Sequence, residues 1–535
     1  MLPEDVLLEM IDFYVGEDMD RESYLYEKHI VGWVKLAHVC RRWRRIVSQS
    51  PTRLNLRLVC TRSTPARDTL NIWPPLPLII FDFEDIFGFK PLDVDNIIAA
   101  LEHNDRVCRI KLDRFSSSEF DFITNSAAMQ KPFLELTYLR LCKFVYNELE
   151  SIIPNSFMGG TAPRLQSFFL HAPFPGLPKL LCSAAHLVNL ELYVPQTGYI
   201  PPKSMATGLS ALTSLEFLRL HFLHPPPRPS LESRLSPPPS LTRSILPNLT
   251  KIIFQGASEY FEVILARIDA PRLADLDIVF FNQIIFDTPQ LFQSIGRRPT
   301  LRAPETGHIE FSHASVTFRF PSHSSDFGVL QVAILCRVSE WQLSYLEQVC
   351  TSSLPPVFTL KDLYIHEGSL TKLRWQDDVE NVVWLELLRP FAAVENLYVC
   401  EEFVPRIAPA LQELVGGRMR EALPTLENIF LDGFQLSGPL HEGVRCRTTA
   451  HQSPCSSFSL GQIMIQNTRR RTGRSMVPFA FYVINVSCFL LTTTISFCTH
   501  LYTFLNTTDD EFIVTSADKL TRSPCRVDLS GAISR

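Results

Sequence analysis

The chain has 535 residues, of which 46% are hydrophobic and 20% are charged, and its formal net charge is −5. A chain of this length and apolar content can bury a sizeable core, and it exceeds the usual size of one domain. Its mildly acidic balance argues against bulk binding of nucleic-acid phosphates, which depends on a basic surface.

Residues 1–47 predict two short amphipathic helices separated by a charged loop. Pro3, Glu4 and Asp5 suit a first helical turn, because proline needs no N–H partner there and acidic side chains complement the helix dipole. Apolar residues then recur at helical spacing, at Leu7, Met10, Ile11 and Tyr14. A second apolar stripe comprises Leu36, Val39, Cys40, Trp43, Ile46 and Val47. Such stripes need a partner, either the rest of the chain or another protein.

Two segments of this region resemble the F-box. The motif is carried by Leu2-Pro3 with Leu7, and by Val39-Cys40-Arg41-Arg42-Trp43 after Leu36. The insertion from Gly16 to Ile30 departs from it, because most F-boxes have a short turn there. A wider resemblance, to an expanded family of F-box proteins in mushroom-forming fungi, covers the chain to about Gly443. It is carried by Asn55–Cys60, Thr64–Asp68 and Trp73–Leu78.

The resemblance implies that the N-terminal helices bind a Skp-type adaptor, which a cullin scaffold holds in turn. It implies that the adaptor-binding residues are among Leu2, Pro3, Leu7, Leu36, Val39 and Trp43. Some of these side chains must instead pack the two helices together, and the sequence does not divide them. The alternative is an ordinary helical hairpin with a local core. We interpret the basic run Arg41–Arg45 as a solvated face rather than a nucleic-acid site.

From residue 106 onward one six-residue phrase recurs: apolar, two variable, apolar, one variable, apolar. Its copies begin at Val107, Leu136, Leu165, Leu187, Leu215, Leu249, Leu273, Leu360, Val394 and Leu426. A short strand that returns at a near-constant period is typical of a leucine-rich solenoid. In the long gap before Leu360, Ser315–Phe320 and Val329–Leu335 are interpreted as degenerate copies. The asparagine that usually follows such a phrase is absent, so we expect an irregular arc, with unrelated strands of an ordinary α/β core as the alternative.

The variable positions of each strand should face away from the stacked core, because side chains alternate between the two faces of a strand. In a solenoid that face is the concave one, so we predict that it binds a protein target. The candidate residues are Tyr138, Arg140, Asn189, Glu191, Phe217, Arg219, Asp275, Asp277, Asp362, Tyr364, Asn396 and Tyr398. Their mixture of aromatic groups and both charge signs suits protein recognition.

Two segments stand apart from the repeats. His224–Ser240 contains seven prolines, which predicts an extended, solvated loop. Beyond Gly443 the repeats stop, and residues 477–508 contain no Asp, Glu, Lys or Arg. That run is long enough to span a membrane, but its threonine, serine and asparagine residues favour an irregular extension over a membrane anchor.

The predicted organisation therefore has four parts. They are an F-box-like helical module (1–50), a linker or cap region (51–105), a leucine-rich-like repeat region (106–443) and an atypical tail (444–535). The predicted fold class is α/β, a short all-α module followed by an irregular leucine-rich-repeat-like solenoid.

No sequence motif predicts catalysis. The phosphate-binding G-x-x-x-x-G-K-[ST] pattern, the zinc-binding H-E-x-x-H pattern and the G-x-S-x-G nucleophile pattern are all missing. His366-Glu367 and His441-Glu442 have no second ligand at helical spacing, so we expect neither a metal nor a cofactor. The thirteen cysteines form no C-x-x-C pair. Together with an N-terminus that does not read as a secretory signal, this predicts the cytosol or the nucleus.

The resemblance implies a non-enzymatic function: a substrate-recruiting F-box subunit of an SCF-type ubiquitin ligase. In that function the helices bind the adaptor and the repeats bind an unknown protein target. The alternative is a solenoid scaffold with no role in ubiquitin transfer, in one version anchored to a membrane through the uncharged run 477–508.

Overall fold

The structure is a computed structural model. It describes residues 3–16, 32–50, 56–62, 65–72, 75–81, 94–143, 152–225, 243–282, 286–298, 305–320, 329–336, 339–352, 359–368, 381–400, 422–432, 465–468 and 479–485, together with a few single residues between these ranges. Most of the insertion (residues 17–30), most of the proline-rich segment (residues 226–240) and residues 477–478 and 486–508 of the uncharged run lie outside the described residues.

The N-terminal module has three described helices, α1 (Glu4–Gly16), α3 (Gly32–Val39) and α4 (Arg41–Gln49). The prediction of one helix through the second apolar stripe was wrong, because the helix breaks at Cys40. That residue is extended (φ −159°, ψ 171°), and its sulfur accepts a hydrogen bond from the backbone N–H of Trp43 at 3.5 Å. Cys40 therefore caps the N-terminus of α4, so that α3 and α4 can fold back against α1.

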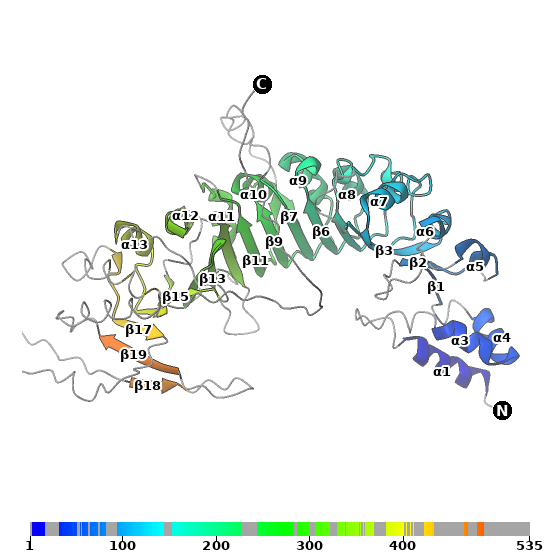
Figure 1. Ribbon diagram of the computed structural model, residues 1–535, viewed down its shortest axis with the longest axis horizontal. Helices are drawn as coiled ribbons and strands as arrows, with labels where there is room; N and C mark the ends of the chain where they lie inside the picture. The colour runs from blue at the N-terminus through cyan, green and yellow to red at the C-terminus, as the bar shows by residue number, and fades with distance from the viewer. Residues whose placement is uncertain are drawn as a thin grey trace, which may run out of the picture. The chain divides into compact units, whose positions relative to one another are not determined.

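One long sheet organises most of the described chain (Figure 1). Its first strands are β1 (Leu58–Cys60), β2 (Leu78–Phe81), β3 (Val107–Phe115), β4 (Tyr138–Lys143), β5 (Ser167–His171), β6 (Asn189–Val194), β7 (Phe217–Phe222), β9 (Lys251–Gly256) and β11 (Asp275–Phe280). The later ones are β12 (Thr306–Phe311), β13 (Ser315–Phe320), β14 (Leu330–Leu335), β15 (Asp362–Glu367), β16 (Asn396–Cys400), β17 (Asn428–Asp432), β18 (Ile465–Thr468) and β19 (Phe479–Asn485).

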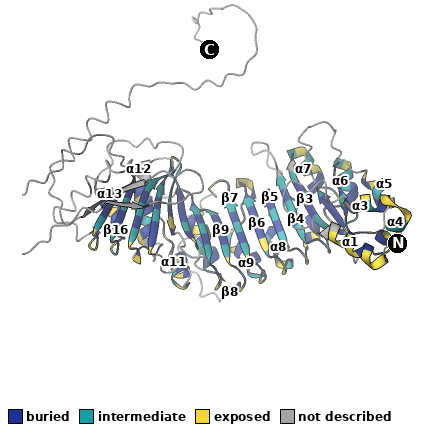
Figure 2. Ribbon diagram, turned by 90° about the horizontal axis from the view of Figure 1, so that it is seen from below, coloured by how far each residue is buried: buried dark blue, intermediate teal, exposed yellow. Residues whose placement is uncertain are grey.

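All ten copies of the phrase contain a strand, as the period predicted. From β3 to β11 the strands are parallel and pair in register, so that Leu139, Phe168, Leu190, Leu218, Ile252 and Leu276 follow one another across the sheet. These side chains are buried, whereas the positions between them are half-buried, an alternation that Figure 2 shows along the strands. The repeated phrase thus builds one continuous apolar face, as in a solenoid-like repeat fold.

The gap in the repeats contains a reversed strand. The strand-like segments expected there are β13 and β14, but β13 runs antiparallel to both of its neighbours, β14 and β12. β14 lies beside β11, and β12 lies beside β15, both in parallel. The three strands therefore form a meander inserted between the parallel repeats rather than three further copies of the repeat.

The sheet begins earlier than the sequence indicated. The region 51–105 was expected to be a linker or cap, yet β1 and β2 extend the parallel sheet from β3. Alternate residues are buried at Leu56, Leu58 and Cys60 in one segment. These two strands are short, with three and four residues.

Among the described residues, helices cover one face of the sheet, and none of the helices of the repeat region lies on the other face (Figure 1). They are α5 (Ala66–Ile72), α6 (Val94–Leu101), α7 (Ser117–Thr124), α8 (Leu177–Ser183), α9 (Pro202–Ser210), α10 (Ser258–Leu265), α11 (Pro289–Gly296), α12 (Ser339–Ser352) and α13 (Asn381–Leu388). Helices α8 to α11 pack on one another in chain order along one side of the sheet (Figure 1). A short parallel pair, β8 (Ser244–Ile245) with β10 (Ile268–Asp269), completes the described strands. We call the side of the sheet opposite these helices the open face.

The tail adds two strands to the end of the sheet. β19 pairs antiparallel with β17, and β18 pairs antiparallel with β19. The first part of the uncharged run is therefore a strand. Within the described part of the chain, no helix combines the length and the apolar character that crossing a bilayer requires.

A half-buried carboxyl group, that of Glu262, makes the contact between two helices of the covering layer sensitive to pH. The carboxylate of Glu262 on α10 accepts hydrogen bonds from the backbone N–H groups of Gln290 and Leu291 at the start of α11, both at 2.8 Å. Burial raises the pKa of this carboxyl to about 7, because desolvation outweighs the two N–H donors.

We expect the free energy of unfolding to fall as the pH is raised from about 4.5 to 7, because in that window the folded state binds the Glu262 proton more tightly than the unfolded state does. Urea unfolding at several pH values measures this, and Glu262→Gln should flatten the dependence. Glu259→Gln, an exposed change on the same helix, is the control, and an equal effect of both substitutions would contradict the prediction.

Candidate functional site

The first candidate surface is a row of apolar side chains on α1. Val6, Met10 and Phe13 are 42%, 49% and 68% exposed, and their spacing places them on one side of the helix. The opposite side, formed by Leu7, Leu8 and Ile11, is buried. We call Val6, Met10 and Phe13 the N-terminal row. Exposed apolar side chains that cluster in this way often mark a binding surface.

The predicted adaptor-binding residues divide between this surface and the core. Pro3 is exposed and Val39 is 61% exposed, whereas Leu36 and Trp43 are half-buried and pack against the core. Leu7 is only 3% exposed, so in this structure it presents almost no surface to a partner. It supports the module instead. Leu2 lies outside the described residues.

Sequence reasoning missed Val6 and Phe13 and placed Met10 on the wrong side of α1. Leu7, Met10 and Ile11 were expected to form one stripe, but Met10 points away from the buried pair. The spacing of Val6, Met10 and Phe13, four and three residues apart, is itself a helical row. It could have been recognised as a second apolar row on the same helix.

The second candidate surface is the open face of the sheet. The structure places all twelve predicted target-binding residues there, in two rows that cross the strands. One row contains Tyr138, Asn189, Phe217, Asp275, Asp362 and Asn396, and the other contains Arg140, Glu191, Arg219, Asp277, Tyr364 and Tyr398. Asn189 is exposed and the others are half-buried, so each still reaches solvent.

Cations and aromatic rings pair on the first strands of the open face. The guanidinium of Arg109 lies 4.1 Å from the ring centroid of Tyr138, and that of Arg140 lies 3.8 Å from the ring of Phe169. The Nε of Arg140 also donates to Asp113 at 2.8 Å. Desolvation between these groups raises the pKa of Tyr138. These contacts hold two guanidinium groups in place on the surface.

The middle strands of the open face carry balanced charge. Arg219 forms an ion pair with Glu191 at 2.6 Å, and one of its N–H groups donates to the Tyr193 hydroxyl at 3.3 Å. The ring of Tyr193 stacks on His221 with centroids 5.0 Å apart. Further along, Lys251 lies 3.8 Å from Asp275.

The last strands of the open face carry a row of stacked rings. His308, Tyr364, Tyr398 and Phe430 lie at successive centroid distances of 4.5, 4.1 and 4.4 Å, with interplanar angles of 7°, 5° and 9°. Because each ring face covers the next, the row presents ring edges and hydroxyl groups to a partner. His308 and Phe430 were not predicted. Phe430 occupies the same phrase position as Tyr398, but His308 lies on β12, where the phrase is absent.

A row of polar side chains runs beside these rings. Asn428 donates to the side-chain oxygen of Asn396 at 2.9 Å, and Asn396 donates to Asp362 at 2.7 Å. The carboxylate of Asp362 is therefore the terminal acceptor of a directed chain of hydrogen bonds. Such a chain holds the negative charge at a defined position on the open face.

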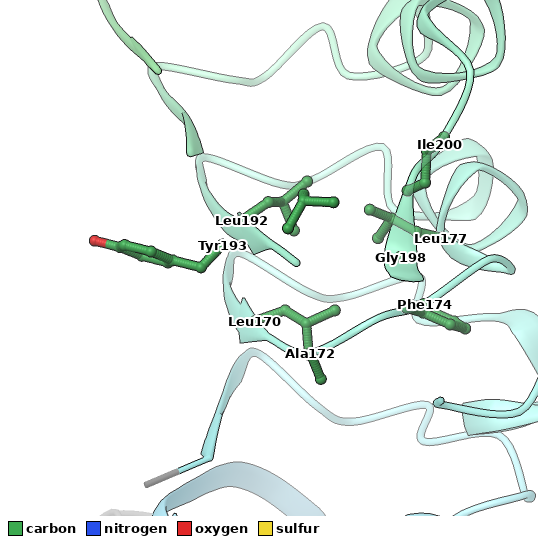
Figure 3. A pocket seen from close by; sticks show the side chains of 9 residues that line it. Leu170, Ala172, Phe174, Leu177, Leu192, Tyr193, Gly198 and Ile200 are labelled. Atoms are coloured by element: carbon green, nitrogen blue, oxygen red, sulfur yellow. The ribbon is translucent and has the colours of Figure 1, made fainter. Parts of the chain in front are cut away.

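A small cavity between the sheet and the helices is not a ligand site (Figure 3). Its volume is about 10 Å³, and apolar side chains such as Leu170, Phe174, Leu177 and Leu192 line it. A bound water needs several polar partners, which these side chains do not offer. Tyr193 points away from the cavity, toward the open face (Figure 3). Among the described residues, no group of three or more His, Cys, Asp and Glu side chains is arranged to hold a metal ion.

Comparison with models of protein families finds no match for this sequence, and comparison with curated proteins finds none either. Among solved structures, the chain is similar to the leucine-rich repeat-containing protein LegL7 from Legionella pneumophila, with 12% sequence identity and a TM-score of 0.24. The similarity covers 63% of this chain and 86% of that one. The assignment of a mixed α/β, solenoid-like repeat fold therefore rests on the in-register parallel strands of the chain itself.

Proposed function

We propose that the chain is a substrate-recruiting F-box subunit of an SCF-type ubiquitin ligase. The N-terminal row carries the proposal, because Val6, Met10 and Phe13 remain exposed whereas Leu7, Leu8 and Ile11 on the opposite side of the same helix are buried. The resemblance of Leu2-Pro3 and of Val39–Trp43 to the F-box identifies the expected partner as a Skp-type adaptor. Val39, also exposed, adds to the apolar surface of the module.

The open face supplies the second half of the proposed function. Its side chains are half-buried and held by neighbours, so a target protein would meet a largely preorganised surface. In this mechanism the chain makes and breaks no covalent bond. It raises the effective concentration of the target near the ubiquitin-loaded enzyme, which makes the transfer nearly intramolecular.

Adaptor binding tests the proposal. We expect Met10→Asp together with Phe13→Asp to weaken binding of a Skp-type adaptor by about 100-fold, because apolar anchors at the centre of an interface supply most of its binding energy. Pull-down of full-length protein by the adaptor, followed by titration calorimetry, measures the effect.

Phe122→Asp is the matched control, because Phe122 is 56% exposed on another helix, α7. Circular dichroism should show that all variants keep the same helix and strand content. If the unmodified chain does not bind an adaptor, or if the double variant binds as tightly as the Phe122→Asp variant, the ligase proposal is wrong. A role as an interaction scaffold would then be the remaining alternative.

A further inference from the structure

Two separate groups of strands on the open face carry opposite net charges, and the sheet continues beyond each of them. On β3 and β4 three cationic side chains, Arg109, Lys111 and Arg140, stand against one carboxylate, Asp113. We call this group the basic end. On β12 and β15 the outward positions carry Glu310 and Asp362 beside His308, Tyr364 and His366, and we call the two carboxylates the acidic end.

The strands between the two ends are close to neutral. Arg219 pairs with Glu191, and Lys251 pairs with Asp275. Arg319, whose Nε donates to Gln331 at 2.8 Å, balances the charge of Asp277 on this stretch. The remaining outward side chains there include the rings of Phe169 and Tyr193. A continuous polyanion would meet attraction at one end and repulsion at the other, which excludes a nucleic-acid track.

We infer that the open face binds an extended segment of the target in which an acidic block and a basic block are separated by a neutral stretch. The acidic block lies over the basic end, and the basic block lies over the acidic end. The inference rests on the proposed function, in which this face holds the target, and it specifies the chemistry of that target.

The register of the sheet sets the length of the neutral stretch. Following the pairing, β4 is joined to β12 through β5, β6, β7, β9, β11, β14 and β13, and β15 follows. Nine strand-to-strand steps between the centres of the two ends correspond to about 43 Å at the usual strand spacing. An extended chain covers that distance in roughly 13 residues.

Synthetic peptides test the inference directly on the full-length protein. The first peptide has a short glutamate block and a short arginine block separated by about 13 Gly/Ser residues. The second has the same blocks separated by about 4 such residues and cannot reach both ends. The third has the same composition as the first, with the charges interleaved. We expect the first peptide to bind about tenfold more tightly than the other two at low ionic strength, with the difference shrinking in high salt.

Neutralising either end should remove this preference. The variants are Arg109→Gln with Lys111→Gln at the basic end, and Glu310→Gln with Asp362→Asn at the acidic end. Asp362→Asn keeps an oxygen that can accept the Asn396 hydrogen bond. The matched control is Arg67→Gln with Glu102→Gln, which removes an exposed ion pair from the helical layer without changing the net charge.

Fluorescence anisotropy with labelled peptides gives the affinities. Equal binding of the three peptides overturns the inference, and so does a preference that survives neutralisation of both ends. Adaptor binding is measured on the same samples. Lost peptide discrimination with intact adaptor binding refutes the inference alone, whereas absent adaptor binding with intact discrimination refutes the ligase proposal alone.

Discussion

Replacing Phe254 with alanine should lower the free energy of unfolding by about 3–5 kcal/mol, the usual cost of removing a large buried aromatic side chain. Phe254 lies on β9, is fully buried, and stacks on Phe261 of α10 with centroids 4.5 Å apart. Edge-to-face contacts with Phe222 and Phe280 connect it to both neighbouring strands. The substitution therefore leaves a cavity where three repeats and one helix meet.

The effect should reach the open face as well as the core. In a repeat fold each unit is stabilised mainly by its neighbours. Because β9 lies between the basic end and the acidic end, weakening it should loosen the fixed arrangement of the two ends. We expect the Phe254→Ala variant to lose the peptide preference at temperatures where the wild-type chain keeps it. Urea unfolding followed by circular dichroism measures the stability. Phe122→Ala, an exposed change, should cost less than about 0.5 kcal/mol, and a loss below about 1 kcal/mol for Phe254→Ala would refute the prediction.

Replacing Arg298 should also lower the free energy of unfolding strongly, because its charged group is buried. Its guanidinium is 5% exposed and donates to the carboxylate of Asp269 at 3.0 Å and to the carbonyl of Ala270 at 2.9 Å. It also donates to the Ser294 hydroxyl at 2.7 Å, which ties the end of α11 to β10. Losing these donors should cost about 2–3 kcal/mol, less than in a fully buried pair, because Asp269 is 36% exposed and water can replace one donor.

Arg298→Met tests this with a side chain of similar length and no charge. Arg298→Lys should recover little of the loss, because an ammonium group cannot reproduce the planar set of donors. Arg164→Met is the matched control, since Arg164 pairs with Glu135 at the surface and is 62% exposed. Its replacement should cost less than about 1 kcal/mol. Thermal and urea unfolding of the three variants measure the difference, and similar losses for Arg298→Met and Arg164→Met would contradict the prediction.

Local apolar patterns predicted the positions of the strands. Each copy of the phrase buries its apolar side chains and leaves the positions between them half-buried, as Leu190 and Glu191 illustrate on β6. This alternation is a property of a few consecutive residues, so it can be recognised in the sequence without knowledge of the tertiary structure. The same alternation occurs in β13, which runs antiparallel. Alternation does not encode strand direction, and the meander was therefore not predicted.

The N-terminal helix shows a similar division. Its apolar residues predicted a helix correctly, but two apolar rows share α1, and the sequence does not say which row faces the core. Packing against α3 and α4 buries Leu7, Leu8 and Ile11 and leaves Met10 outside. The assignment of an exposed docking surface to the N-terminal row thus depends on tertiary contacts.

The sequence by itself determined the repeating strands, the open positions along them and the helical character of the N-terminus, because each follows from the spacing of neighbouring residues. Tertiary structure alone decided which distant positions meet, as His308 and Tyr364 do across β12 and β15. It also decided the order of strands through the meander, and with it the distance between the two charged ends of the open face. Both depend on strand register, which is set by pairing between segments far apart in the chain.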